Sequence, residues 1–131
     1  MADHPNAELV RRGLKAFADQ DMRAVGELFA DDIVWHVPGD SPLSGDYKGK
    51  EEVFGFFAKL GELSGGSFRL DVHDVIGNDE HVVALVTASG SRPDGRSLEM
   101  RLAQTFHIRN GKAVEFWGLA EDQAAGDAFW A

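Results

Sequence analysis

The sequence predicts one α+β domain spanning residues 1–131, with N-terminal helices packed on a curved antiparallel sheet that forms a conical barrel with an internal pocket. Three observations support this fold class. Apolar residues recur at helical spacing over the first half of the chain. Apolar and polar residues alternate over much of the second half, as in strands with one buried face. Asn110-Gly111 separates two alternating stretches, and this dipeptide is typical of a tight hairpin turn because both residues tolerate positive φ.

Three helices are expected in the first half of the chain. Asn6 can cap the first helix, and Glu8 suits the positive end of its dipole. Asp21 is a suitable N-cap for a short second helix that ends by residue 32. The third helix is expected over residues 51–64, since two acids open it and Gly65-Gly66 ends it.

Between the second and third helices, residues 33–37 predict a short strand that Pro38 ends. The residues from 39 to 49 are rich in Gly, Pro, Ser and Asp and therefore predict a loop. Loops of this length in compact domains often carry function.

The second half predicts consecutive strands over residues 68–76, 81–91, 97–109 and 112–122, with turns rich in Gly, Asn and Asp between them. The final residues 124–131 predict a last helical turn. Helices followed by hairpins give the α+β layout, with the helices covering one face of the sheet.

The strand over residues 97–109 has one face that is apolar except for a single glutamine. The residues on that face are Met100, Leu102, Gln104, Phe106 and Ile108. Gln104 can both donate and accept hydrogen bonds, which suits it to orient a ligand carbonyl or hydroxyl. The alternative is a structural glutamine bonded to a neighbouring helix or to water.

Composition excludes several classes of function. A net charge of −9 disfavours nucleic acid and anionic membrane surfaces, which both need a basic face. The chain has no cysteine, so disulfides and thiolate chemistry are excluded. The first residues lack the apolar core of a signal peptide, and a cytoplasmic location is expected.

Three segments in this order resemble the nuclear transport factor 2-like fold, and within it the SnoaL-like and ketosteroid isomerase-related branch. They are LFADDIVWHVPG (28–39), LSGDYKGKEEVFGFF (43–57) and FHIRNGKAVEFW (106–117). The resemblance runs from about residue 7 to residue 122. It implies a helix-covered cone-shaped sheet, a homodimer, and an activity drawn from isomerases, cyclases, epoxide hydrolases, dehydratases or non-catalytic adaptors.

The chain departs from this family at the positions that carry its chemistry. Ketosteroid isomerases place an aspartate just before the proline that ends the first strand, where this chain has Val37. Their helix-one tyrosine falls on Gly13 and their second pocket acid on Gln104. SnoaL-like cyclases read His-Trp-Asp where this chain reads Phe116-Trp117-Gly118. The family's usual base and acid pair are therefore missing.

His36 and Asp122 are the remaining candidates for proton transfer. The ordinary pKa of histidine, about 6.5, suits acid–base chemistry near neutral pH. Strict alternation, however, places His36 on the opposite face from Trp35 and Val37, unless a bulge twists the end of the strand. Asp122 either lies at the cavity rim as a base or caps the terminal helical turn.

We expect a small cofactor-free enzyme of isomerase, cyclase or dehydratase type, acting on an apolar or aromatic carbonyl compound; the alternative is a non-catalytic binder or a dimeric structural module. A metal site is not expected, because the histidines lack ligand spacing. The alternate face of the long strands, with Trp117, is the expected dimer contact. The expected pocket walls are Leu14, Phe17, Trp35, Val37, Phe54, Phe57, Leu102, Phe106 and Phe116.

Overall fold

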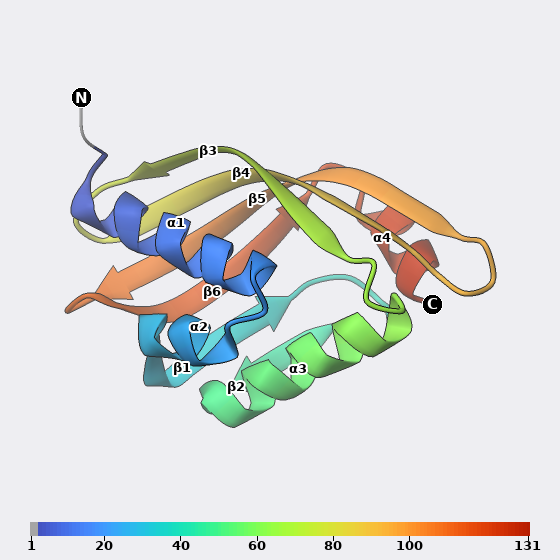
Figure 1. The fold of residues 1–131 in the computed structure, drawn as a ribbon, viewed down its shortest axis with the longest axis horizontal. Coiled ribbons are helices and arrows are strands. Elements are labelled where there is room, and N and C mark those ends of the chain that lie inside the picture. The colour runs from blue at the N-terminus through green and yellow to red at the C-terminus, as the bar shows by residue number, and fades with distance from the viewer. Residues whose placement is uncertain (1–2) are drawn as a thin grey trace.

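In the computed structural model, residues 3–131 are described, and they form four helices and six strands (Figure 1). The helices α1 and α3 cover one face of the sheet, and α4 lies at one end of it. The elements in chain order are α1 (Pro5–Ala18), α2 (Met22–Leu28), β1 (Phe29–Val37), β2 (Gly45–Lys48), α3 (Gly49–Leu63), β3 (Arg69–Gly77), β4 (His81–Ser91), β5 (Ser97–Arg109), β6 (Lys112–Ala120) and α4 (Gln123–Trp130).

The sheet has the strand order β2-β1-β6-β5-β4-β3. The α+β class with helices over a cone-shaped sheet is confirmed, but the sheet is mixed and open. Strands β1 and β6 are parallel, with Trp35 opposite Phe116, whereas all other neighbours are antiparallel. The parallel pair arises because β1 lies in the sheet beside β6, the last strand, although the two strands are far apart in the sequence.

The helix caps agree with the sequence in part. Asp21 caps α2 by accepting a hydrogen bond from the Ala24 N–H at 3.2 Å, as expected. The cap of α1 is His4 rather than Asn6. The Asn6 side chain instead donates to the carbonyl oxygens of Asn78 and Asp79, at 3.0 and 3.1 Å, and ties α1 to the β3–β4 turn.

The region expected to be a loop over residues 39–49 contains β2, which pairs antiparallel with β1 at the edge of the sheet. Most of β2 is exposed, so its sequence carries no strong apolar alternation. Residues 38–44 remain a loop, and they form part of the wall at one end of the molecule.

The β5–β6 hairpin is confirmed. Asn110 and Gly111 both have positive φ, 52° and 74°, and form a two-residue turn. The register shifts between His107 and Ile108, which indicates a bulge beside the turn. Because of this shift, Ala113 is fully buried, whereas alternation alone predicts Val114 on the inner face.

The outer face of the sheet carries a histidine held between two carboxylates. His36 Nδ1 lies 2.7 Å from Asp46 Oδ1, and its Nε2 lies 2.7 Å from Glu115 Oε2. The ring also stacks on Trp117, with centroids 5.6 Å apart. Hydrogen bonds to Asp46 and to Glu115 raise the pKa of His36 above its usual 6.5. The protonated ring donates from both nitrogens, so the cluster stabilises the charged form.

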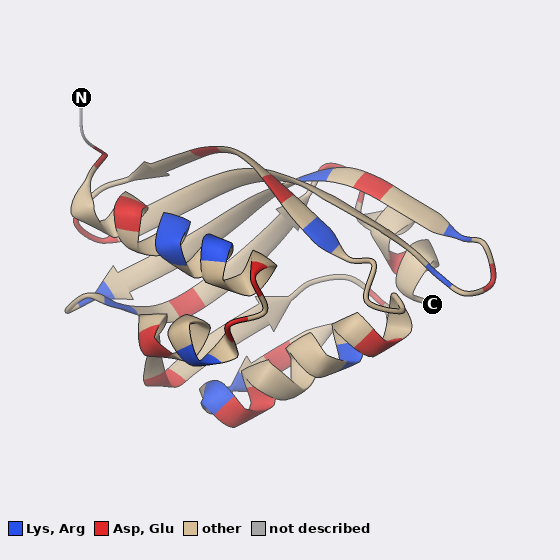
Figure 2. Ribbon diagram, viewed as in Figure 1, with Lys and Arg blue, Asp and Glu red and all other residues tan. Residues whose placement is uncertain are grey.

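Charged residues of both signs are spread over the helices and strands (Figure 2). No helix within residues 3–131 is long and apolar enough to cross a membrane.

The His36 cluster predicts a specific pH dependence of stability. The stabilisation is complete below the unfolded pKa of about 6.5 and is lost as the pH rises through the raised folded pKa. Urea unfolding of the wild type and of His36→Gln between pH 6 and pH 9 should show a stability difference that is largest at pH 6. Asp46→Asn should flatten this profile in part, because it replaces one of the two carboxylates by a neutral amide. A difference that is constant over the range would contradict the prediction.

Candidate functional site

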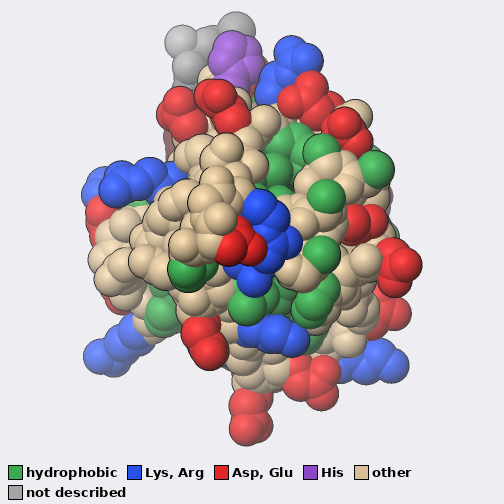
Figure 3. Space-filling view, turned by 90° about the vertical axis from the view of Figure 1, so that its right-hand side faces the viewer, with side chains coloured by type: hydrophobic (Ala, Val, Ile, Leu, Met, Phe, Trp, Pro, Cys, Tyr) green, Lys and Arg blue, Asp and Glu red, His purple; other side chains and the backbone are tan. Residues whose placement is uncertain are grey.

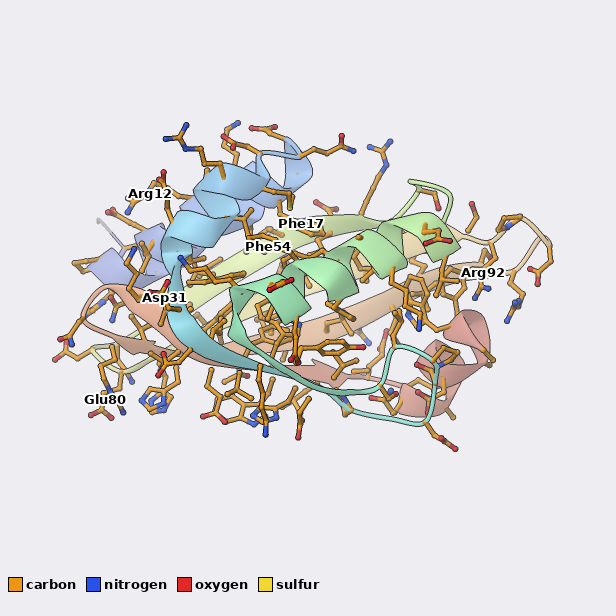
Figure 4. The ribbon with its side chains drawn as sticks, turned by 90° about the horizontal axis from the view of Figure 1, so that it is seen from below. Arg12, Phe17, Asp31, Phe54, Glu80 and Arg92 are labelled. Atoms are coloured by element: carbon orange, nitrogen blue, oxygen red, sulfur yellow. The ribbon has the colours of Figure 1, made fainter. Side chains whose placement is uncertain are left out.

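A cavity of about 170 Å³ lies between the inner face of the sheet and the helices α1 and α3. The side chains in this space come from both layers, as Figure 4 shows from the side of α3. The loop over residues 38–44 and α4 form its wall at one end of the molecule. Figure 3 views this end, where hydrophobic side chains lie exposed between charged ones.

Aromatic rings form a large part of the cavity wall. The rings of Trp35 and Phe116 stack with centroids 3.7 Å apart, a contact set by the parallel pairing of β1 and β6. Phe57 packs edge-on against Trp35 at 5.3 Å, and Phe106 packs edge-on against Phe116 at 5.2 Å. Such ring contacts add to the free energy of burial and favour flat, apolar ligands.

Gln104 is a buried polar side chain in this apolar wall. It is only 8% exposed, and its Oε1 is buried with no hydrogen-bond partner among the described residues. On the neighbouring strand β6 it faces Gly118, which has no side chain to fill the space beside it. A buried acceptor without a partner costs about 1–3 kcal/mol. The cavity therefore contains one polar group that a ligand can satisfy.

The structure brings together most of the wall residues predicted from the sequence. Phe54 is the exception, since it lies beside Phe17 in a neighbouring groove between α1, α3 and β3 (Figure 4). Helix α3 carries all three phenylalanines, and it directs Phe56 and Phe57, not Phe54, towards the cavity. The predicted residues that line the cavity are Leu14, Phe17, Trp35, His36, Val37, Phe57, Leu102, Gln104, Phe106 and Phe116.

Of the two predicted proton carriers, His36 belongs to the cavity lining, whereas Asp122 does not. The imidazole of His36 is held on the outer face by Asp46 and Glu115, as alternation along β1 predicts. Asp122 is exposed and caps α4 by accepting from the Ala125 N–H at 3.1 Å, the structural role considered for it. Neither the ring nor this carboxylate projects from the inner wall, and their catalytic roles stay predictions.

Three polar residues of the lining were missed by the sequence analysis: Ser41 in the loop over residues 38–44, and Gln123 and Asp127 on α4. Asp127 and Gln123 lie on the same side of α4, one turn apart, at the end of the cavity. The Gln123 amide donates to Asp127 Oδ1 at 3.0 Å. Their i, i+4 spacing was the only available signal, and it indicates neighbouring side chains on a helix rather than a cavity.

Gly13 also lines the cavity, at the position that the resemblance assigns to a tyrosine. A side chain there would overlap Leu28, so the glycine lets α1 and α2 pack closely. Within residues 3–131 no cluster of His, Asp and Glu side chains is suited to hold a metal ion.

Comparisons with known proteins agree with this architecture. The chain is 30% identical to the uncharacterised protein Rv0034 of Mycobacterium tuberculosis over 132 residues, covering 100% of both. The structure of Bal32a, from a soil-derived mobile gene cassette, is 34% identical and superimposes with a TM-score of 0.93 over 97% of both chains. IdmH of Streptomyces antibioticus, a candidate polyketide cyclase, is 23% identical with a TM-score of 0.73 over 90% of this chain and 93% of that one, and so shares the fold.

The model of the SnoaL-like domain matches residues 10–116, which include the strands β1 to β5 and most of β6. These residues supply most of the cavity wall, whereas α4 with Asp127 lies beyond the match. With its helix-covered conical sheet of the nuclear transport factor 2-like type, the chain belongs to the SnoaL-like domain family.

Proposed function

We propose that this protein takes a small, mostly apolar molecule bearing a carbonyl or hydroxyl group into the inner cavity, where Gln104 orients it for cofactor-free isomerase, cyclase or dehydratase chemistry. The buried amide oxygen of Gln104, which has no hydrogen-bond partner among the described residues, carries this proposal. Native structures pair nearly all their buried polar atoms, so an unpaired one needs a reason. A ligand hydroxyl that donates to Gln104 Oε1 supplies that reason, and a ligand carbonyl can in turn accept from the Nε2 of the same amide.

The aromatic wall supports the same class of ligand. Preformed apolar cavities with a few polar groups are the usual form of small-molecule sites. Relatives of the fold point in the same direction, since IdmH is a candidate polyketide cyclase. Without a metal or cofactor, such a site acts by orienting the substrate and by placing dipoles where charge develops.

Replacing Gln104 by the apolar isostere methionine should separate stability from binding. Gln104→Met removes the unsatisfied amide, so the free energy of unfolding should rise by about 1 kcal/mol or more. Affinity should fall about tenfold for 2-naphthol, whose hydroxyl can donate to Oε1, and for 2-acetylnaphthalene, whose carbonyl can accept from Nε2, because each probe loses its partner. Urea unfolding and calorimetric titration measure the two effects.

Leu102→Met is the matched control, since Leu102 lines the same wall without a polar atom. It should leave the binding of both probes within a few-fold of wild type. Unchanged affinity in Gln104→Met, with probes that bind the wild type, would refute the role of Gln104.

A second candidate function is non-catalytic binding of the same class of ligand. The positions of His36 and Asp122 favour it, because one is engaged on the outer face and the other caps α4. A binder needs the cavity and Gln104 but no group that moves a proton.

Turnover assays on cyclic enones, aromatic ketones and epoxides distinguish the two candidates. If His36 or Asp122 is the general base, its removal by His36→Gln or Asp122→Asn should lower the rate about 100-fold. From their positions we expect losses of only a few-fold in both variants. If no compound turns over while 2-naphthol still raises the melting temperature, the binding function is favoured.

We also propose that the outer face of the sheet forms a homodimer. Leu119 and Ile76 on this face are 58% and 57% exposed, and Trp117 lies between them and the His36 cluster. Arg101 and Glu121 form an ion pair at 2.8 Å on the same face. Apolar side chains bordered by charges suit a two-fold interface, in which one patch meets its own copy.

Sedimentation equilibrium at micromolar concentration should show a dimer for the wild type. Trp117→Asp and Leu119→Asp should shift it towards monomer, because each buries an unpaired charge in the interface. Ala58→Asp, at an exposed site on α3, adds the same charge on the opposite layer and should stay dimeric. A monomeric wild type would remove the proposal.

A further inference from the structure

The end of the cavity beside α4 carries a carboxylate that the proposed function does not use. Asp127 is the only acidic residue that lines the cavity within residues 3–131. One of its oxygens, Oδ1, accepts from the Gln123 amide at 3.0 Å. A carboxylate offers about four acceptor positions, so most of its capacity is left for another donor.

This carboxylate is held in place from two sides. Gln123 also donates to the Pro38 carbonyl oxygen, at 3.4 Å, which links α4 to the loop that faces it. Gly39 in that loop has φ +98° and packs so closely against Asp127 and Gln123 that any side chain at residue 39 would overlap both. Asp127 is therefore oriented before a ligand arrives, which lowers the entropy cost of a hydrogen bond to it.

Gln104 and Asp127 lie at separate places along the cavity. Gly126, next to Asp127, packs on the end of the Met100 side chain, and both residues line the cavity. Gln104 lies four residues further along β5 than Met100. At about 3.3 Å per residue, Gln104 and Met100 are roughly 13 Å apart along the strand. The wall between Gln104 and Asp127 is apolar, with Leu98, Met100, Leu102 and Ala120.

We propose that the ligand is an elongated molecule with an apolar middle and a polar group at each end, and that Asp127 selects the outer group. The inner group bonds to Gln104, and the outer group is a hydrogen-bond donor, either a hydroxyl or an ammonium group. This proposal rests on the proposed function, since it names the substrate class for the same cavity. It makes Asp127 a specificity-determining residue.

Three two-ring probes test this assignment by calorimetric titration: 4-hydroxybiphenyl, 4,4′-dihydroxybiphenyl and 4-(aminomethyl)-4′-hydroxybiphenyl. The two bifunctional probes differ from the first only by a donor at the far end. We expect at least one of them to bind about tenfold more tightly than 4-hydroxybiphenyl, because a hydrogen bond to a charged group is among the stronger kinds. The hydroxyl and aminomethyl probes distinguish a neutral from a cationic outer group.

Asp127→Asn should clearly weaken this preference, because the amide oxygen still accepts but the charge is lost, while the affinity for 4-hydroxybiphenyl stays nearly unchanged. A general structural effect of the substitution would weaken all three probes equally. Asp127→Glu, which keeps the charge, should recover part of the preference. Asp40→Asn is the matched control: Asp40 is an exposed carboxylate in the facing loop and lies outside the lining, so its removal should keep the full preference.

The outcomes separate this inference from the proposed function. If 4-hydroxybiphenyl binds in a manner that depends on Gln104, but neither far-end donor improves binding, the proposed function stands and the role of Asp127 is overturned. A preference that is undiminished in Asp127→Asn would also overturn it. If none of the three probes binds, both proposals fall together.

Discussion

The pairing of β5 with β6 across the Asn110-Gly111 turn decides which side chains meet inside the molecule. Side chains alternate strictly along a strand, so a slip of one residue would exchange the two faces of the sheet. In the observed register Gln104 and Phe106 point into the cavity, while Thr105 pairs with Trp117 on the outer side. The stacked rings of Trp35 and Phe116 then depend on β6 presenting the same face to β1.

Features that depend on neighbours in the chain could be predicted from the sequence. The hairpin turn, the Asp21 cap and the inward face of β5 follow from positive φ, from capping chemistry and from alternation, which are all local. The position of His36 on the outer face follows from alternation too. For Asp122 the sequence left a rim acid and a helix cap open, and the hydrogen bond to Ala125 shows the cap.

Features that depend on distant contacts could not be predicted in the same way. The parallel pairing of β1 with β6 joins segments that lie about eighty residues apart, and β2 pairs only because β1 offers it an edge. Asp127 enters the cavity because Gly126 lets α4 approach Met100 and because Gly39 makes room in the facing loop. From helical spacing alone, Asp127 would be predicted to lie on the solvent-facing side of a helix.

A lone amide in an aromatic wall also decides how finely the cavity can distinguish related compounds. Van der Waals contact with rings such as Trp35 and Phe116 changes by only about 1–3 kcal/mol for each methylene group that a skeleton gains or loses. A compound without a group for Gln104 leaves a buried acceptor unpaired, and sites that bind a polar group reject analogues lacking it far more strongly. If Gln104 has the proposed binding role, the protein should therefore tolerate a family of skeletons while requiring one polar atom at a fixed place.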